Sequence, residues 1–158
     1  MNRFLVTPAG YDKLVKALKR EKEVVRPQIV RDIEEARAHG DISENSEFED
    51  AKERQAHCAG RIAMLENSFA SAEVIDVTKI EASDRVVFGT TVQIVNVDTD
   101  EERTWKIVGQ NEADVENRLI SYKSPIGAAM IGKSVGDEFE VRTPSGKQTW
   151  SIEEVHYL

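Results

Sequence analysis

Two long helical patterns meet at the stretch Ala36-Arg37-Ala38-His39-Gly40-Asp41-Ile42-Ser43-Glu44-Asn45-Ser46-Glu47-Phe48. Before this stretch, apolar residues recur at helical spacing, at Tyr11, Leu14, Val15, Leu18, Val25, Ile29, Ile33 and Ala36. After it, alternate steps of three and four residues make a heptad seam of Phe48, Ala51, Gln55, Cys58, Ile62, Leu65, Phe69 and Ala72. The stretch therefore predicts a turn between two long amphipathic helices.

The two stripes match when the chain is folded back on itself. Facing residues then have numbers that add to 87, as in Ala36 with Ala51, Ile29 with Cys58, Val25 with Ile62, Leu18 with Phe69 and Val15 with Ala72. A constant sum predicts an antiparallel coiled-coil hairpin whose turning point falls near residues 43 and 44. Arms of about 30 residues reach on the order of 45 Å. The small Ala36 and Ala51 predict a thin distal end.

Local signals define the start, the bend and the end of the first arm. Thr7 followed by Pro8 predicts a helix start, because Thr is a preferred N-cap and Pro is tolerated at the first helical position. Pro27 lacks the amide that an interior helical position needs and clashes one turn back, so we expect a kink or short break near Val24–Arg26. Gly40 is expected to end the helix.

The pattern changes from helical to extended at Val74–Val77. Turn signals then separate expected strands at 85–88, 91–97, 103–108, 118–121, 138–142, 149–152 and 155–157. Ser124 as N-cap, Pro125 at the first helical position and Gly132 as the stop predict one short helix. The predicted fold class is α+β. It combines a helical hairpin in residues 1–75, with its tip at about 38–46, and an antiparallel sheet with one short helix in 76–158.

Length and composition exclude several classes of protein. The 158 residues suit one ordinary domain or two small ones. No run approaches the roughly 18 apolar residues of a membrane span and no signal-peptide pattern begins the chain, so we expect a soluble, cytoplasmic protein. Cys58 is the only cysteine, which excludes a disulfide framework and a cysteine-based metal site. The three histidines lack metal-ligand spacing.

Charge is unevenly distributed along the chain. A formal net charge of −8 argues against broad coating of nucleic acid, which needs many Lys and Arg contacts to phosphate. Residues 3–31 contain eight Lys and Arg against three Asp and Glu, whereas residues 32–53 contain nine acidic residues against two basic ones. The acidic concentration around the turn suits a cation or a basic protein surface.

Asp41 and Glu44 are the candidate functional pair. Two acids in a turn most often serve the structure, with Asp41 as an N-cap and Glu44 in the first turn of the next helix. Their place at the end of a thin probe favours a second interpretation, since it would deliver them into a partner's interior. Carboxylate oxygens suit Mg²⁺, which takes one or two protein carboxylates together with water and substrate phosphate. Two carboxylates are too few for a two-metal site, so the pair would be half of an active site completed by a partner.

Arg37 and Lys52 are the only basic residues in the segment 32–53. The constant sum predicts that they flank the hairpin a turn or two behind its apex. They either make helical charge contacts with Glu34 or Glu49, or guide one phosphate or base of an RNA.

The stretch around the turn closely resembles the tip signature of the bacterial Gre transcript-cleavage factors, a family of transcription elongation factors. Other segments resemble the same family in the same order, namely Thr7-Pro8-Ala9-Gly10, Arg26-Pro27, Ser124-Pro125-Ile126-Gly127, Ile131-Gly132-Lys133 and Val135-Gly136-Asp137. The resemblance covers the whole chain and is nearer to the GreA branch than to GreB, which carries a larger basic patch. One departure is Lys52, where Arg is common in GreA-type tips. Lys keeps the charge but loses the bidentate phosphate geometry.

The resemblance implies a partner, bacterial RNA polymerase, and a site. The coiled coil would enter the secondary channel of the polymerase and reach the 3′ end of backtracked RNA. Asp41 would help to hold a second, weakly bound Mg²⁺ in the polymerase's own active site, and Glu44 would orient or deprotonate the attacking water. Arg37 and Lys52 would guide the RNA.

The resemblance also assigns the remaining parts. The second half would be an FKBP-like domain that docks on the channel rim through Ser124, Pro125 and Ile126. The factor would bind no cofactor stably, would share Mg²⁺ with the polymerase, and would not be an enzyme by itself. We expect a monomer with no membrane partner.

Three other functions fit parts of the sequence. A channel-binding factor could inhibit polymerase without stimulating cleavage, although Asp41 and Glu44 in a short regular tip argue against it. An FKBP-like prolyl isomerase needs an apolar, aromatic-lined pocket, and the aromatic residues of the second half are expected in the core: Phe88, Trp105, Tyr122, Phe139, Trp150 and Tyr157. A coiled-coil adaptor without chemistry is the third.

Overall fold

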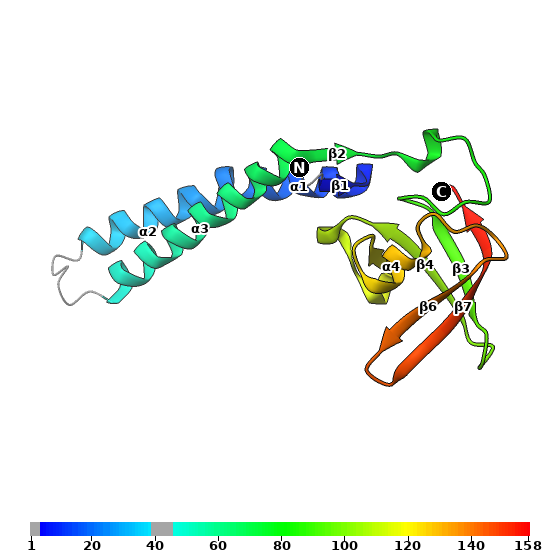
Figure 1. Ribbon diagram of the computed structural model, residues 1–158. Coiled ribbons are helices and arrows are strands. Elements are labelled where there is room, and N and C mark those ends of the chain that lie inside the picture. The colour runs from blue at the N-terminus through cyan, green and yellow to red at the C-terminus, as the bar shows by residue number, and fades with distance from the viewer. Residues whose placement is uncertain (1–3, 39–45) are drawn as a thin grey trace. The chain divides into compact units, whose positions relative to one another are not determined.

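The computed structural model describes residues 4–38 and 46–158 (Figure 1). The chain divides into two compact units. One is Asp12–Ala72, and the other takes in Tyr11 and the residues before it together with Glu73–Leu158. A helical hairpin followed by a sheet confirms the predicted α+β fold class. The domain boundary expected between residues 75 and 76 stays a prediction. No described helix has the length and apolar character needed to cross a membrane.

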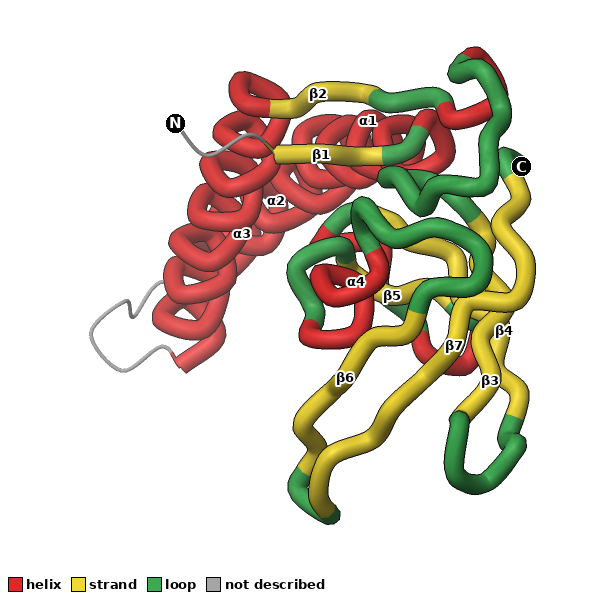
Figure 2. The backbone as a smooth tube through the Cα atoms, turned by 45° about the vertical axis from the view of Figure 1, so that its right-hand side comes forward, coloured by secondary structure: helices red, strands yellow, loops and turns green. Residues whose placement is uncertain are grey.

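The first arm of the hairpin is helical from end to end. It begins with α1 (Pro8–Arg20), passes through a π-helical segment (Glu21–Val25) and continues as α2 (Arg26–Ala38), and the second arm is α3 (Ser46–Ser71). Both views show α2 and α3 side by side (Figures 1 and 2). The predicted helix start is confirmed, because the Gly10 amide donates to Thr7 Oγ1 at 3.1 Å and α1 begins at Pro8. The expected stop at Gly40 lies outside the described residues.

The seam between the arms uses the residues that the constant sum brings together. Its buried cluster consists of Ile29, Cys58 and Ile62, with Leu18, Val25 and Ile33 packed against it. Ala36 and Ala51 are only 3% and 1% exposed, so these two small side chains are buried where α2 and α3 pack together. Val15 was expected on the seam but is 42% exposed.

Where a kink or short break was expected, near Val24–Arg26, the structure has the π-helical segment and no break. The Arg26 amide donates to the carbonyl of Glu21, five residues earlier. Pro27 has no amide to donate, and its ring would meet a carbonyl one α-helical turn back. A wider turn directly before the proline accommodates both effects without interrupting the helix.

Glu21 connects the π-helical segment to α3. Its Oε1 accepts a hydrogen bond from Arg61 Nε at 2.8 Å, and Cys58 Sγ lies 3.3 Å from Oε2. The hydrogen bond from Arg61 is the main reason that the pKa of Glu21 lies below its ordinary value of 4.5, and the contact with Cys58 adds to it. Burial raises the pKa of the Cys58 thiol.

Glu21→Gln removes the ion pair with Arg61 and is expected to lower the free energy of unfolding by about 1 kcal/mol at neutral pH. The expected effect is small because Arg61 is half exposed and solvent screens the pair. The pKa of Glu21 is lower in the folded state, so the carboxylate stabilises the protein above pH 4.5. This stabilisation is lost as the pH falls through the folded pKa. Thermal unfolding across this range should show the variant and the wild type converging in acid. A difference that stays constant with pH would contradict the assignment.

The second half of the chain forms a five-stranded sheet with the order β5-β4-β3-β7-β6. The strands are β3 (Thr91–Asn96), β4 (Glu102–Val108), β5 (Leu119–Ser121), β6 (Glu138–Thr143) and β7 (Gly146–His156). All neighbours pair antiparallel except β4 and β5, which are parallel. The sheet is therefore mixed. Ten residues separate β4 from β5, including two turns of 3₁₀ helix, and they carry the chain back so that Leu119 pairs with Lys106 in the second half of β4.

One expected strand is wrong. Residues 85–88 contain only an isolated bridge, between Arg85 and Ser134. The backbone of Val86 instead bonds to the segment after the short helix, donating to the Lys133 carbonyl at 2.7 Å and accepting from the Gly132 amide at 2.9 Å. Apolar alternation identified the buried residues here but not the backbone partner.

Two further expectations change in detail. The strands expected at 149–152 and 155–157 are one continuous strand, β7, with a bulge at Glu153 where its register with β3 shifts. A small sheet of β1 (Phe4–Val6) and β2 (Ala72–Val74) was not predicted, because three residues are too few to show a period (Figure 2).

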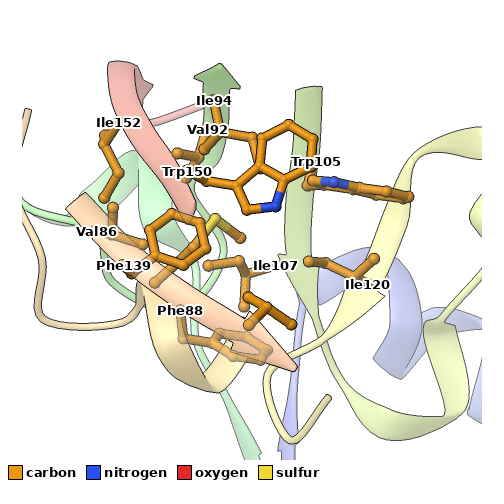
Figure 3. Close-up of a cluster of buried hydrophobic side chains, with 12 residues drawn as sticks. Val86, Phe88, Val92, Ile94, Trp105, Ile107, Ile120, Phe139, Trp150 and Ile152 are labelled. Atoms are coloured by element: carbon orange, nitrogen blue, oxygen red, sulfur yellow. The ribbon is translucent and has the colours of Figure 1, made fainter. Parts of the chain in front are cut away.

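The core of this half lies between the sheet and α4 (Pro125–Met130), which packs against β5 and β6. Figure 3 shows the cluster, which consists of Val86, Phe88, Val92, Ile94, Trp105, Ile107, Ile120, Met130, Phe139, Val141, Trp150 and Ile152. Four of the aromatic residues expected in the core belong to it. Tyr122 lies beside it, with its ring edge-on to Phe88 at 5.5 Å between centroids.

Candidate functional site

The candidate catalytic pair, Asp41 and Glu44, lies outside the described residues, and its role stays a prediction. The described helices end at Ala38 and begin again at Ser46. The seven-residue connection between them therefore joins two helices that already lie side by side and contains both acids.

Arg54 connects the two arms on the acidic part of the hairpin. Its Nη1 lies 3.0 Å from Oδ2 of Asp32 on α2, and its Nε lies 3.2 Å from Oδ2 of Asp50 on α3. Gln28 Nε2 donates to Asp32 Oδ1 at 2.9 Å. The hydrogen bond from Gln28, followed by that from Arg54, lowers the pKa of Asp32. The guanidinium of Arg54 thus pairs with two of the nine acidic residues of the segment 32–53.

A shallow hollow of about 210 Å³ lies next to Arg54. Its lining consists of Asp32, Glu35, Ala36, Glu47, Asp50 and Arg54. Four carboxylates around one arginine make this face of the hairpin acidic, as the charge distribution predicts. Among residues 4–38 and 46–158, no three Asp, Glu, His or Cys side chains are grouped so that they could hold a metal ion.

Arg37 and Lys52 lie on opposite arms. Arg37 is exposed in the last turn of α2. Lys52 is exposed on the second turn of α3, where its Nζ donates to Gln55 Oε1 at 3.3 Å. Both side chains face solvent near the end of the described hairpin, and guidance of RNA by them stays a prediction.

The acidic segment 32–53 ends one residue before Arg54, so its charge pattern did not point to this arginine. Two signals could have identified it. It follows Asp50 by four residues, the spacing of a helical ion pair. Its number and that of Asp32 add to 86, close to the value that describes the seam.

The residues expected to dock on the polymerase form the start of α4. Ser124 Oγ accepts from the Gly127 amide at 3.1 Å and donates to the Ser121 carbonyl at 2.7 Å. Pro125 is exposed, and Ile126 is half-buried against the core. Gly127 is required for space, because a Cβ there would lie 2.2 Å from the Ser121 carbonyl oxygen. The packing explains this motif, and its docking role stays a prediction.

The aromatic residues of the sheet do not form an open prolyl-peptide site. Phe88, Trp105, Phe139 and Trp150 are each less than a tenth exposed. Their rings fill the core instead of lining a pocket, which argues against the isomerase alternative.

Comparisons with known proteins agree over both halves of the chain. Residues 4–74 match the family model described as "Transcription elongation factor, N-terminal", and residues 81–157 match "Transcription elongation factor, GreA/GreB, C-term". Transcription elongation factor GreA of Francisella philomiragia subsp. philomiragia is 48% identical over 155 residues, which cover 98% of this chain and 97% of that protein. The protein of the same name from Francisella tularensis subsp. novicida is 49% identical over 156 residues, 99% and 98% of the two chains.

A solved structure is also similar. GreA factor homolog 1 (Gfh1) of Thermus thermophilus is 29% identical, with a TM-score of 0.44 and coverage of 98% of this chain and 99% of that chain. The family models together span most of the sequence, and the GreA relatives are nearly half identical over almost its full length. The chain therefore belongs to the GreA/GreB family of transcription elongation factors.

Proposed function

We propose that this chain is a GreA-type elongation factor that stimulates the cleavage of backtracked RNA by bacterial RNA polymerase. It works in the cytoplasm as a monomer and inserts its hairpin into the secondary channel. One observation carries the proposal: α2 and α3 form a paired helical hairpin in which the small residues Ala36 and Ala51 are almost fully buried, and the sequence between these helices contains Asp41 and Glu44. Such a pair can enter a channel that a globular domain cannot.

The chemistry of the two carboxylates supports their proposed roles. Carboxylate oxygens are the ligands that Mg²⁺ takes from proteins, and Mg²⁺ sites usually use only one or two of them. Asp41 is the proposed ligand, completing a site whose other ligands belong to the polymerase. The shared Mg²⁺ would stabilise charge on the scissile phosphate. Glu44 orients the attacking water or accepts its proton.

The remaining site residues have supporting roles in this proposal. Arg37 and Lys52 are exposed on opposite arms and would contact RNA phosphate or base. Ser124, Pro125 and Ile126 would contact the rim of the channel. Bond breaking belongs to the polymerase, and the factor supplies groups that its active site lacks.

Backtracked elongation complexes with labelled RNA test this function directly. Adding the protein and Mg²⁺ should release short 3′ fragments and leave a shortened transcript that the polymerase extends. The matched control omits the protein, and a second control omits Mg²⁺. Slower RNA synthesis without fragment release would contradict the proposal and support a channel-binding inhibitor.

A further inference from the structure

The segment Thr7-Pro8-Ala9-Gly10 meets Glu112, a residue far away in the sequence that no motif singled out. Glu112 ends the first 3₁₀ turn of the connection between β4 and β5. Thr7, Gly10 and Glu112 all belong to the compact unit that contains the sheet. The start of α1 is therefore held by the second half of the chain.

One carboxylate makes all the contacts. Glu112 Oε2 accepts from the Thr7 amide at 3.1 Å and from the Gly109 amide at 2.8 Å, while Oε1 accepts from the Thr7 hydroxyl. Thr7 Oγ1 in turn accepts from the Gly10 amide at 3.1 Å. The hydroxyl of Thr7 thus caps α1 and binds Glu112 at the same time. We call Thr7, Gly10, Gly109 and Glu112 the Glu112 clasp.

Both glycines of the clasp make room for it. A Cβ on Gly10 would lie 2.2 Å from Glu112 Cδ, and a Cβ on Gly109 would lie 2.4 Å from the Leu5 carbonyl oxygen and 2.8 Å from Glu112 Oε2. Gly109 has an ordinary φ of −70°. Space, not backbone conformation, excludes a side chain at this position. Two residues without side chains, Gly10 and Gly109, lie against a carboxylate that accepts three hydrogen bonds. This combination indicates a site built to hold the Glu112 carboxylate.

The Glu112 clasp holds the first turn of a long continuous helix. Hydrogen bonds to a carboxylate are stronger than those between neutral groups, so they fix the first turn of α1 firmly. From Pro8 the chain stays helical to Ala38, a length of about 46 Å at the usual rise per residue. A tilt of about 5° at its start would move its far end by roughly 4 Å. Misplacement of catalytic groups by about 1 Å can cost about 100-fold in rate.

We propose that Glu112 is a positioning residue for transcript cleavage, because it holds the first turn of the helical arm that leads in sequence to Asp41 and Glu44. The inference rests on the function proposed above. It predicts that damage to the clasp lowers the maximal rate of cleavage at saturating factor, while affinity for polymerase changes little. A residue needed only for folding would lower both through loss of folded protein.

Gly10→Ala tests the clasp with a single methyl group. Alanine favours helix more than glycine does, so the change strengthens α1 itself while it displaces Glu112. We expect faster hydrogen exchange at the amides of Thr7 and Gly109, and a maximal cleavage rate lower by about 10- to 100-fold. Gly60→Ala is the matched control, because a Cβ there meets no atom within 4 Å. It should leave exchange and cleavage unchanged.

A second pair of variants keeps the test decisive if Gly10→Ala folds poorly. Thr7→Val removes the hydroxyl at nearly constant shape and should reproduce the loss of cleavage. Thr7→Ser retains the hydroxyl and should cleave RNA at the wild-type rate. Faster amide exchange with full cleavage would overturn the positioning role, and unchanged exchange would overturn the clasp. If the wild type itself releases no fragments, the proposed function fails and the positioning role fails with it. The exchange rates still show whether the clasp forms.

Discussion

Asp41→Ala is expected to abolish the release of short 3′ RNA fragments and to leave binding to polymerase nearly intact. The proposed role of Asp41 is to complete a Mg²⁺ site, and alanine offers no oxygen ligand. Losing one electrostatic stabiliser of the transition state typically costs about 100- to 1,000-fold in rate. Single-turnover cleavage of backtracked complexes at saturating factor measures this loss, and a competition assay measures the affinity.

The matched control is Glu49→Ala. Glu49 is an exposed acid in the first turn of α3, so its removal changes the net charge by the same amount. Cleavage should persist in this variant, because the proposal gives Glu49 no ligand role. If both variants lose activity equally, cleavage depends on the total negative charge of this region and not on a metal ligand at position 41. Normal cleavage by the Asp41 variant would show that the assignment is wrong.

Ala51→Leu is expected to destabilise the hairpin and to suppress cleavage. Ala51 is 1% exposed and lies on α3, which packs against α2. Three extra carbon atoms cannot fit there, and overpacking of this kind costs about 1–3 kcal/mol. The arms should separate next to the connection that holds both acids. We expect a lower melting temperature of the helical signal and a loss of cleavage of about 10-fold or more.

Ala59→Leu provides the control for this substitution. Ala59 lies on the same helix but faces solvent, so a larger side chain meets little resistance. Its melting temperature and cleavage should match those of the wild type. If Ala51→Leu cleaves RNA normally despite a lower melting temperature, close approach of the arms is not needed for the reaction.

The sequence was most informative where structure depends on short-range periodicity. The heptad spacing from Phe48 to Ala72 and the constant sum predicted the hairpin and its buried residues Ile29 and Cys58. Helix signals were also reliable, since Thr7 and Ser124 both cap the helices expected to follow them. The helix signals depend on residues three or four apart, and the pairing of the two arms depends on a single register, in which the numbers of facing residues add to 87.

Features that depend on distant partners could not be predicted in this way. The segment 85–88 has strand-like alternation, but its backbone bonds to residues beyond α4. The parallel pairing of β5 with β4 depends on the path of the connection before it. Glu112 lies in that connection, and its partner Thr7 precedes it by 105 residues, so no local pattern marks this contact. For the candidate site, the roles of Asp41 and Glu44 stay predictions, and the charge pattern did not point to Arg54, which bridges the arms.

The two buried tryptophans make the unfolding of each unit separately visible. Trp105 and Trp150 both lie in the core beside the sheet, and residues 12–72 contain neither Trp nor Tyr. Intrinsic fluorescence therefore reports on the sheet unit alone, whereas far-ultraviolet circular dichroism is dominated by the long helices of the other unit. Following both signals through one denaturant titration would separate two transitions without any label. A variant such as Ala51→Leu should shift only the helical transition.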